Sequence, residues 1–217
     1  MDFQLRLSLS PRDNEILDSL TLRVRLLSVS QVARTWWAET ANPEANATER
    51  LKLLEKAGLV QRFTAMARPE LPLEAPIVVW EVGQAPPDFG AASYRLQARF
   101  TAALQKRPCV IATRMAGARF GGKGGRLPRK AEQTHDIHMA AVFLRYRSLH
   151  PNLIEHWQSE EIIKRDRPAK KGEKLPDAMI RTGTWDRVVE FGGEYNRDKL
   201  IAFHDYCAEK GFPYEIW

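Results

Sequence analysis

Acidic side chains near the C-terminus are the residues of this chain best suited to hold a divalent cation. Asp177 follows a proline, and Glu190 lies in the apolar run 187–191, so the two carboxylates belong to neighbouring extended segments. Glu160 and Glu161 precede them in the chain. Mg²⁺ prefers carboxylate oxygens and keeps part of its water shell when it binds. Carboxylates that converge from adjacent strands would therefore bind Mg²⁺ as a metal-dependent nuclease does.

A nuclease of this pattern also needs a lysine two residues after the second carboxylate, and that position is Gly192. The lysine would position or polarise the attacking water. Lys199 on the following helix and Lys174 before the first strand are the nearest substitutes, because the chemistry depends on position in space. Against catalysis, the two glycines at 192–193 indicate a tight turn. The acids would then be structural, as a turn residue and a strand-end residue paired with arginines.

Length and composition allow two domains. A chain of 217 residues can form two units that each bury a core. It contains no apolar run of about 18 residues and no N-terminal segment typical of a signal peptide, so we expect a cytoplasmic protein without a membrane span. Cys109 and Cys207 lie in apolar or helical surroundings without metal-site spacing, which favours buried free thiols.

The net charge of +6 is confined to one segment. Acidic and basic residues cancel over the rest of the chain, whereas 111–130 has six basic residues, no acid and several glycines. We expect 109–131 to be a basic, flexible linker that follows a phosphate backbone, with an inert solvated linker as the alternative.

Three helices are expected before residue 60. Ser10 and Pro11 mark a helix start, and a second helix follows Ser28. A third runs over about 47–57 and ends at Gly58.

The segment from Arg50 to Val60, a basic leucine-rich helix followed by Gly-Leu-Val, resembles the third helix and strand entry of winged helix-turn-helix domains. The resemblance implies a two-stranded wing, which we expect at 60–66 and 77–82 with its tip at 68–76. An added amphipathic helix at about 91–106 would either dimerise the protein or pack against the wing. A protein-interaction domain is the alternative to DNA binding.

The partner expected on this basis is double-stranded DNA, with a homodimer possible. In the winged domain, the expected DNA-contacting residues are Gln31, Arg34, Asn46, Thr48, Arg50, Lys52, Lys56, Arg62 and Arg68. In the basic segment, they are Arg119, Lys123, Arg126, Arg129 and Lys130.

The C-terminal part alternates helices and strands. The predicted order is a helix at 135–149, an extended stretch at 154–158, strands at 175–180 and 186–191, a helix at 198–209 and a strand at 212–217. We therefore predict an α+β fold with domains at 1–108 and 132–217, joined by the linker 109–131.

This order resembles the replication-relaxation family of plasmids and other mobile elements. The resemblance rests on short motifs, namely His135-Asp136, Trp157 with Glu160-Glu161, Leu175-Pro176-Asp177-Ala178, Val189-Glu190, Lys199 and Tyr206. It implies a winged helix-turn-helix followed by a domain similar to the PD-(D/E)xK nuclease fold. On that resemblance, Asp177 and Glu190 match the two motif acids, Glu161 or Glu160 is the optional upstream acid, and the motif lysine is missing.

Two functions follow from these patterns. The first is a DNA-binding protein that regulates transcription or plasmid replication, has a non-catalytic nuclease-like domain and needs no cofactor. The alternative is a Mg²⁺-dependent endonuclease or nickase. In that case Asp177, Glu190 and Lys199 would be catalytic, and Glu161, Asp177 and Glu190 would bind the metal.

Overall fold

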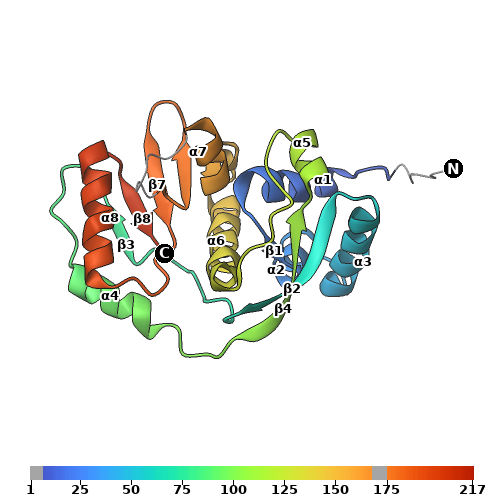
Figure 1. Cartoon of the computed structure of the whole chain (residues 1–217), viewed down its shortest axis with the longest axis horizontal. Coiled ribbons are helices and arrows are strands. Elements are labelled where there is room, and N and C mark those ends of the chain that lie inside the picture. Colours follow the sequence, from blue (N-terminus) through green and yellow to red (C-terminus); the bar gives the residue numbers. More distant parts are fainter. Residues whose placement is uncertain (1–6, 168–174) are drawn as a thin grey trace. The chain divides into compact units, whose positions relative to one another are not determined.

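The computed structural model describes residues 7–167 and 175–217 and has two separate small sheets (Figure 1). Among the described residues, helices make up 48% and strands 18%, which confirms the α+β class. Two compact units are present. Unit 1 contains the chain up to Ala67 together with Leu104–Ala140, and unit 2 contains Arg68–Ala103 together with Ala141–Trp217. The chain thus passes between the units three times, which differs from the expected linear division at 108 and 132.

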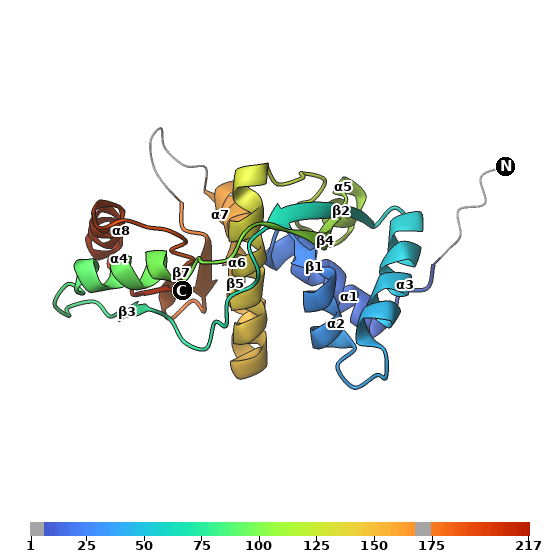
Figure 2. The same ribbon diagram turned by 90° about the horizontal axis from the view of Figure 1, so that it is seen from below.

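Unit 1 begins with helices whose start signals lie in the sequence. Helix α1 (Pro11–Asp18) has a capping box between Ser10 and Asp13, and it continues into the π-helical turn η1 (Ser19–Arg23). Helix α2 (Val29–Trp36) has a second capping box between Ser28 and Gln31. Helix α3 (Pro43–Lys56) starts at proline, and the chain then turns at Gly58 with φ of 73°. Figure 2 shows these helices together.

The sheet of unit 1 corrects the expected wing. Strand β2 (Val60–Ala67) pairs antiparallel along its whole length with β4 (Gln105–Ala112), and β1 (Leu27–Ser28) pairs with the other side of β4. The partner predicted at 77–82 was wrong. The prediction chose the next apolar run in the sequence and assigned the residues up to 106 to a helix. Proline is tolerated there because β1 pairs only with Cys109 and Val110, which leaves that side of β4 open at Pro108.

The segment between β2 and β4 belongs to unit 2. It contains β3 (Val78–Trp80) and α4 (Phe89–Ala98). The amphipathic helix predicted at 91–106 therefore exists but ends at Ala98, since the residues from Gln105 onward are drawn into the ladder with β2.

The basic, glycine-rich segment is not the flexible linker that we expected. It forms the end of β4 and α5 (Arg114–Arg119), and the glycines that follow pack against unit 1. The Lys123 amide donates to the Thr21 carbonyl at 2.8 Å, and the Gly125 amide donates to the Ala112 carbonyl at 2.7 Å. Backbone packing therefore explains the glycines better than flexibility does.

Unit 2 contains a five-stranded sheet in the order β3-β8-β7-β6-β5. Its other strands are β5 (Trp157–Ser159), β6 (Ala178–Arg181), β7 (Asp186–Glu190) and β8 (Tyr214–Ile216). Neighbouring strands are antiparallel except β7 and β8, which are parallel. The chain reaches β8 through helix α8 (Arg197–Lys210), as a parallel connection requires. The predicted order of helices and strands is confirmed here with two differences: the stretch expected to be extended at 154–158 is a 3₁₀ turn up to His156, and a short helix at Glu160–Asp166 was not predicted.

Helices pack on both faces of this sheet. Leu96 of α4 and Phe203 of α8 belong to the core on one face. On the other face, Phe143 and Tyr146 of helix α6 (Lys130–Leu149) contact Trp157 of β5 at ring-centroid distances of 5.5 and 5.3 Å. The 3₁₀ turn η2 (Pro151–His156) and helix α7 (Glu160–Asp166) flank β5. None of the helices in the described ranges has the length and apolar character needed to cross a membrane.

The glycine packing of unit 1 gives a stability prediction. A Cβ at Gly122 would lie 2.2 Å from the Thr21 carbonyl oxygen, so Gly122→Ala forces the backbone apart and should cost about 2 kcal/mol of unfolding free energy. Gly90 of α4 is the control, because its Cβ would meet only the side chain of Asp88 at 3.3 Å, and alanine favours a helix. Urea unfolding should show a lower midpoint for Gly122→Ala alone. Equal midpoints would contradict this packing.

Candidate functional site

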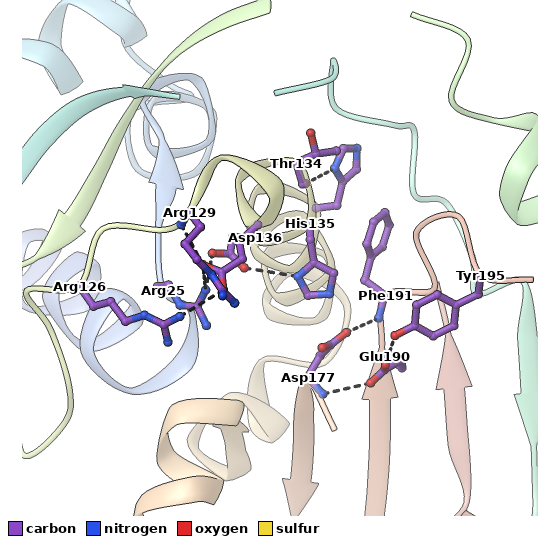
Figure 3. Close-up of polar contacts among 12 residues, drawn as sticks. Arg25, Arg126, Arg129, Thr134, His135, Asp136, Asp177, Glu190, Phe191 and Tyr195 are labelled. Atoms are coloured by element: carbon purple, nitrogen blue, oxygen red, sulfur yellow. Dashed lines mark hydrogen bonds and ion pairs between the residues drawn. The ribbon is translucent and has the colours of Figure 1, made fainter. Parts of the chain in front are cut away.

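The two predicted acids lie side by side at one end of the unit 2 sheet. Ala178 pairs with Val189, so Asp177, just before β6, is adjacent to Glu190, the last residue of β7. The Asp177 amide donates to Oε2 of Glu190 at 3.1 Å, and the Phe191 amide donates to Oδ2 of Asp177 at 2.9 Å (Figure 3). Each carboxylate therefore accepts a hydrogen bond from the backbone beside the other.

Tyr195 completes this cluster, and the sequence analysis did not single it out. Its hydroxyl donates to Oε1 of Glu190 at 2.5 Å, so each oxygen of this fully buried carboxylate accepts a hydrogen bond. Burial, together with the negative charges of Glu190 and Asp177, raises the pKa of Tyr195 well above its ordinary value, and the phenol keeps the proton it donates. The sequence signal that could have identified Tyr195 is its position directly after the turn at 192–193, close to Glu190 in the chain.

Lys199, the predicted substitute for the motif lysine, joins the cluster through Tyr195. Its Nζ atom lies 3.6 Å from the centroid of the Tyr195 ring, a cation–π contact. Position 192 itself is closed to side chains, because a Cβ there would lie 2.8 Å from both Ile216 and Leu96. The side chains of α4 and β8 that pack here therefore leave no space for the motif lysine at position 192.

The third predicted metal ligand, Glu161, lies in the first turn of α7. This helix is linked to the acid pair by its backbone, since the Glu160 amide donates to the Asp177 carbonyl at 2.9 Å. Within the two described ranges, no three His, Cys, Asp or Glu side chains are grouped so that they could hold a metal ion. The residues that the described contacts bring together are Asp177, Glu190, Tyr195 and Lys199. Lys174, the other substitute considered, lies outside the described residues.

Gln31 and Arg50, two of the residues predicted to contact DNA, have structural roles in unit 1. Gln31 is fully buried, accepting from the Ser28 amide at 2.9 Å and donating to the Ile137 carbonyl at 2.8 Å. Arg50 pairs with buried Asp13, its Nε lying 2.8 Å from Oδ1. Buried Gln31 has no surface with which to contact DNA, so this prediction was wrong. Arg50 pairs with Asp13 but remains partly exposed, so its contact with DNA stays a prediction.

Arg68 was expected at the wing tip and lies instead in unit 2. It donates to the Phe100 carbonyl at 2.8 Å and contacts Glu194 at 3.4 Å. Because the β2–β4 ladder ends at Ala67, the predicted position of Arg68 at the tip of a wing was wrong, whereas its contact with DNA stays a prediction.

The other predicted contacts remain at the surface of unit 1. Thr48 and Arg62 are half-buried, and Arg62 pairs with Glu55 at 2.8 Å. The exposed residues are Arg34, Asn46, Lys52, Lys56, Arg119, Lys123, Arg126, Arg129 and Lys130.

An internal acid partly neutralises the basic segment. Glu132 in the first turn of α6 lies 2.6 Å from Arg129, 3.1 Å from Arg126 and 3.4 Å from Arg25. Burial would raise the pKa of Glu132, but the hydrogen bonds from Arg129 and the charges of Arg25 and Arg126 outweigh it and lower the pKa to about 2. Two of the arginines expected to contact phosphate therefore already have a carboxylate partner.

Unit 1 also contains a cavity of about 550 Å³, which we call the hairpin cavity. It lies between the start of α2, the first two turns of α3 and the β2–β4 hairpin. The residues that line it are Ser28, Val29, Ser30, Glu44, Thr48, Arg62, Phe63, Thr64, Lys106, Arg107, Pro108 and Cys109. Lys106 and Arg107 were not among the predicted contacts, because their segment was assigned to a helix end rather than to β4.

Comparison with known proteins found no matching family model, no similar curated protein and no similar solved structure.

Removing Arg50 should destabilise unit 1. Arg50→Ala leaves Asp13 buried without its ion partner, which we expect to cost about 3 kcal/mol of unfolding free energy at pH 7. Burial would raise the pKa of Asp13, but hydrogen bonds from Arg50 and Ser10 outweigh it and lower the pKa.

The stability that this pair contributes is therefore present above the unfolded-state pKa of about 3.9 and is lost as the pH falls through the folded-state pKa. In urea unfolding, the gap between wild type and Arg50→Ala should narrow below about pH 4. Lys56→Ala, an exposed change in the same helix, is the control and should have little effect. A pH-independent gap would contradict the assigned pair.

Removing the Tyr195 hydroxyl should destabilise unit 2. Tyr195→Phe deletes the donor to a buried carboxylate and should cost about 2 kcal/mol, since hydrogen bonds to charged groups exceed those between neutral groups. Tyr94→Phe on α4 is the control, because that tyrosine is 77% exposed. Thermal or urea unfolding of the two variants measures the difference, and equal stabilities would mean that the Glu190 bond contributes nothing.

Proposed function

We propose that this chain is a double-stranded-DNA-binding protein that regulates transcription or replication of a plasmid or other mobile element, in the manner of the replication-relaxation family. The observation that carries the proposal is the topology of unit 1. Its order is α1, β1, α2, α3, β2 and β4, with the sheet order β1-β4-β2. Three helices with such a hairpin are typical of winged helix-turn-helix domains, whose third helix enters the major groove.

The surface of α3 supports DNA as the partner. Lys52 and Lys56 are exposed on this helix, whereas Leu51 and Leu54 are buried against the unit 1 core. Phosphate contacts from lysine and arginine supply most of the affinity of such proteins, and side chains on the groove-facing helix supply the preference between sequences.

The topology of unit 2 supports a nuclease-like ancestry. After α6 come three antiparallel strands, β5, β6 and β7, with α7 between β5 and β6, and then helix α8 and strand β8, which is parallel to β7. This arrangement is typical of the PD-(D/E)xK fold, and the acids lie at the expected strand ends. We propose that the domain is non-catalytic and serves assembly or a second DNA contact.

The hydrogen bonds of the acid pair support the non-catalytic assignment. Oε1 and Oε2 of Glu190 accept from Tyr195 and the Asp177 amide, and Oδ2 of Asp177 accepts from the Phe191 amide. A metal ion would have to compete with these donors for the same oxygens. Position 192 also has no room for the lysine of the motif.

DNA binding and cleavage can be measured on the purified full chain. With a fluorescent duplex of mixed sequence, we expect affinity to fall steeply between about 50 and 200 mM salt, because most contacts are to phosphate. In parallel, supercoiled plasmid with Mg²⁺ or Mn²⁺ should remain uncut.

Absence of binding at low salt would refute the DNA-binding proposal. Cleavage that disappears in Asp177→Ala, with the variant still folded by circular dichroism, would instead establish the endonuclease alternative. Because Asp177 takes part in the hydrogen bonds of the sheet end, the unfolding midpoint of the variant must be measured before its activity is interpreted.

A further inference from the structure

The hairpin cavity combines hydrogen-bond donors with an excess of positive charge. Arg62, Lys106 and Arg107 line it, against a single carboxylate, Glu44. Arg62 also pairs with Glu55, which is not part of the lining, so Lys106 and Arg107 supply most of the uncompensated charge. The cavity wall is therefore cationic even though this part of the chain is nearly neutral in sequence.

Arg107, which lines the cavity, has one donor without a partner. The Nε atom of Arg107 is buried and makes no hydrogen bond within the described part of the chain, whereas its Nη2 donates to Oε1 of Gln105 at 3.0 Å. A buried donor left without an acceptor destabilises the fold. Arg107 therefore has donor capacity that the chain itself does not use, which suits a ligand that brings acceptor oxygens.

The remaining polar wall provides hydroxyl groups. Ser30, Thr48 and Thr64 line the cavity from α2, α3 and β2 respectively. Hydroxyls together with guanidinium and ammonium groups are the side chains that bind phosphate oxygens in protein–DNA complexes. The same chemistry binds free inorganic phosphate.

From this wall we infer that the hairpin cavity binds a phosphate group of the DNA backbone. The inference rests on the proposed function and adds the surface that meets the DNA. The cavity adjoins the first two turns of α3 through Glu44 and Thr48, so a phosphate bound there sets the backbone beside the helix proposed to enter the groove. Glu44 repels this phosphate and lowers the affinity.

The test uses the full chain and two charge-matched double variants. Lys106→Gln with Arg107→Gln removes two cavity cations, and Lys164→Gln with Lys210→Gln removes two exposed cations of unit 2. The cavity variant should bind duplex DNA about tenfold more weakly, and its slope of log affinity against log salt should be smaller by about one. The loss should be equal for different duplex sequences, and the control variant should match wild type.

Glu44→Gln provides a readout of opposite sign. Removing the repulsion should tighten DNA binding several-fold, which a merely structural role of the cavity residues would not produce. If the double variant unfolds, the single variant Lys106→Gln keeps the test valid, because Lys106 is exposed and its substitution should leave the fold intact. Unchanged affinity and salt slope in both cavity variants would overturn the inference while leaving DNA binding by wild type intact.

Titration of wild type with inorganic phosphate, followed by NMR of the backbone amides, separates the two sources of phosphate. If wild type binds no DNA, the proposed function fails by itself. Shifts at Lys106 and Arg107 on adding phosphate would then show a cavity that binds the free anion. No shifts and no DNA binding would overturn the phosphate site as well.

Discussion

The structure depends on the pairing of β2 with β4. Eight residue pairs, from Val60 opposite Ala112 to Ala67 opposite Gln105, close a hairpin whose strands are separated in sequence by Arg68–Leu104. Closing such a long loop costs chain entropy, which the full ladder and the buried side chains of Ala65, Cys109 and Ile111 must offset. Once the ladder is formed, the intervening residues are free to complete unit 2, where β3 pairs with β8 and α4 packs beside α8.

The acid pair illustrates how a nuclease-like arrangement can be kept for structural reasons. A buried carboxylate is costly unless donors surround it, and Glu190 has two of them in the Asp177 amide and the Tyr195 hydroxyl. These bonds join the end of β7 to the residue before β6 and to the turn that precedes α8. The acids thus contribute to the sheet end whether or not any chemistry takes place there.

Charge in the sequence and charge available at the surface differ in this protein. The basic segment after β4 contains the whole net excess, yet Arg126 and Arg129 meet Glu132 of α6. Lys106 and Arg107 lie in a stretch whose acids and bases nearly cancel, but Glu44 is the single acid of that stretch that lines the hairpin cavity with them. A phosphate responds to the charges within about a Debye length, so the local arrangement matters more than the sum over a stretch of sequence.

Local signals in the sequence were enough to predict the α+β class, the helix starts at Ser10 and Ser28, the turn at Gly58 and, apart from α7, the order of elements in the C-terminal part. They also placed Asp177 and Glu190 on adjacent strands. These features depend on capping, glycine conformation and apolar periodicity, which act over a few residues. Which strand pairs with β2, the packing that closes position 192, the partners of Gln31 and Arg50, and the role of Tyr195 depend on residues far away in the chain. Only the tertiary structure decided them, because strand pairing and buried polar contacts are selected by the energy of the whole packed core.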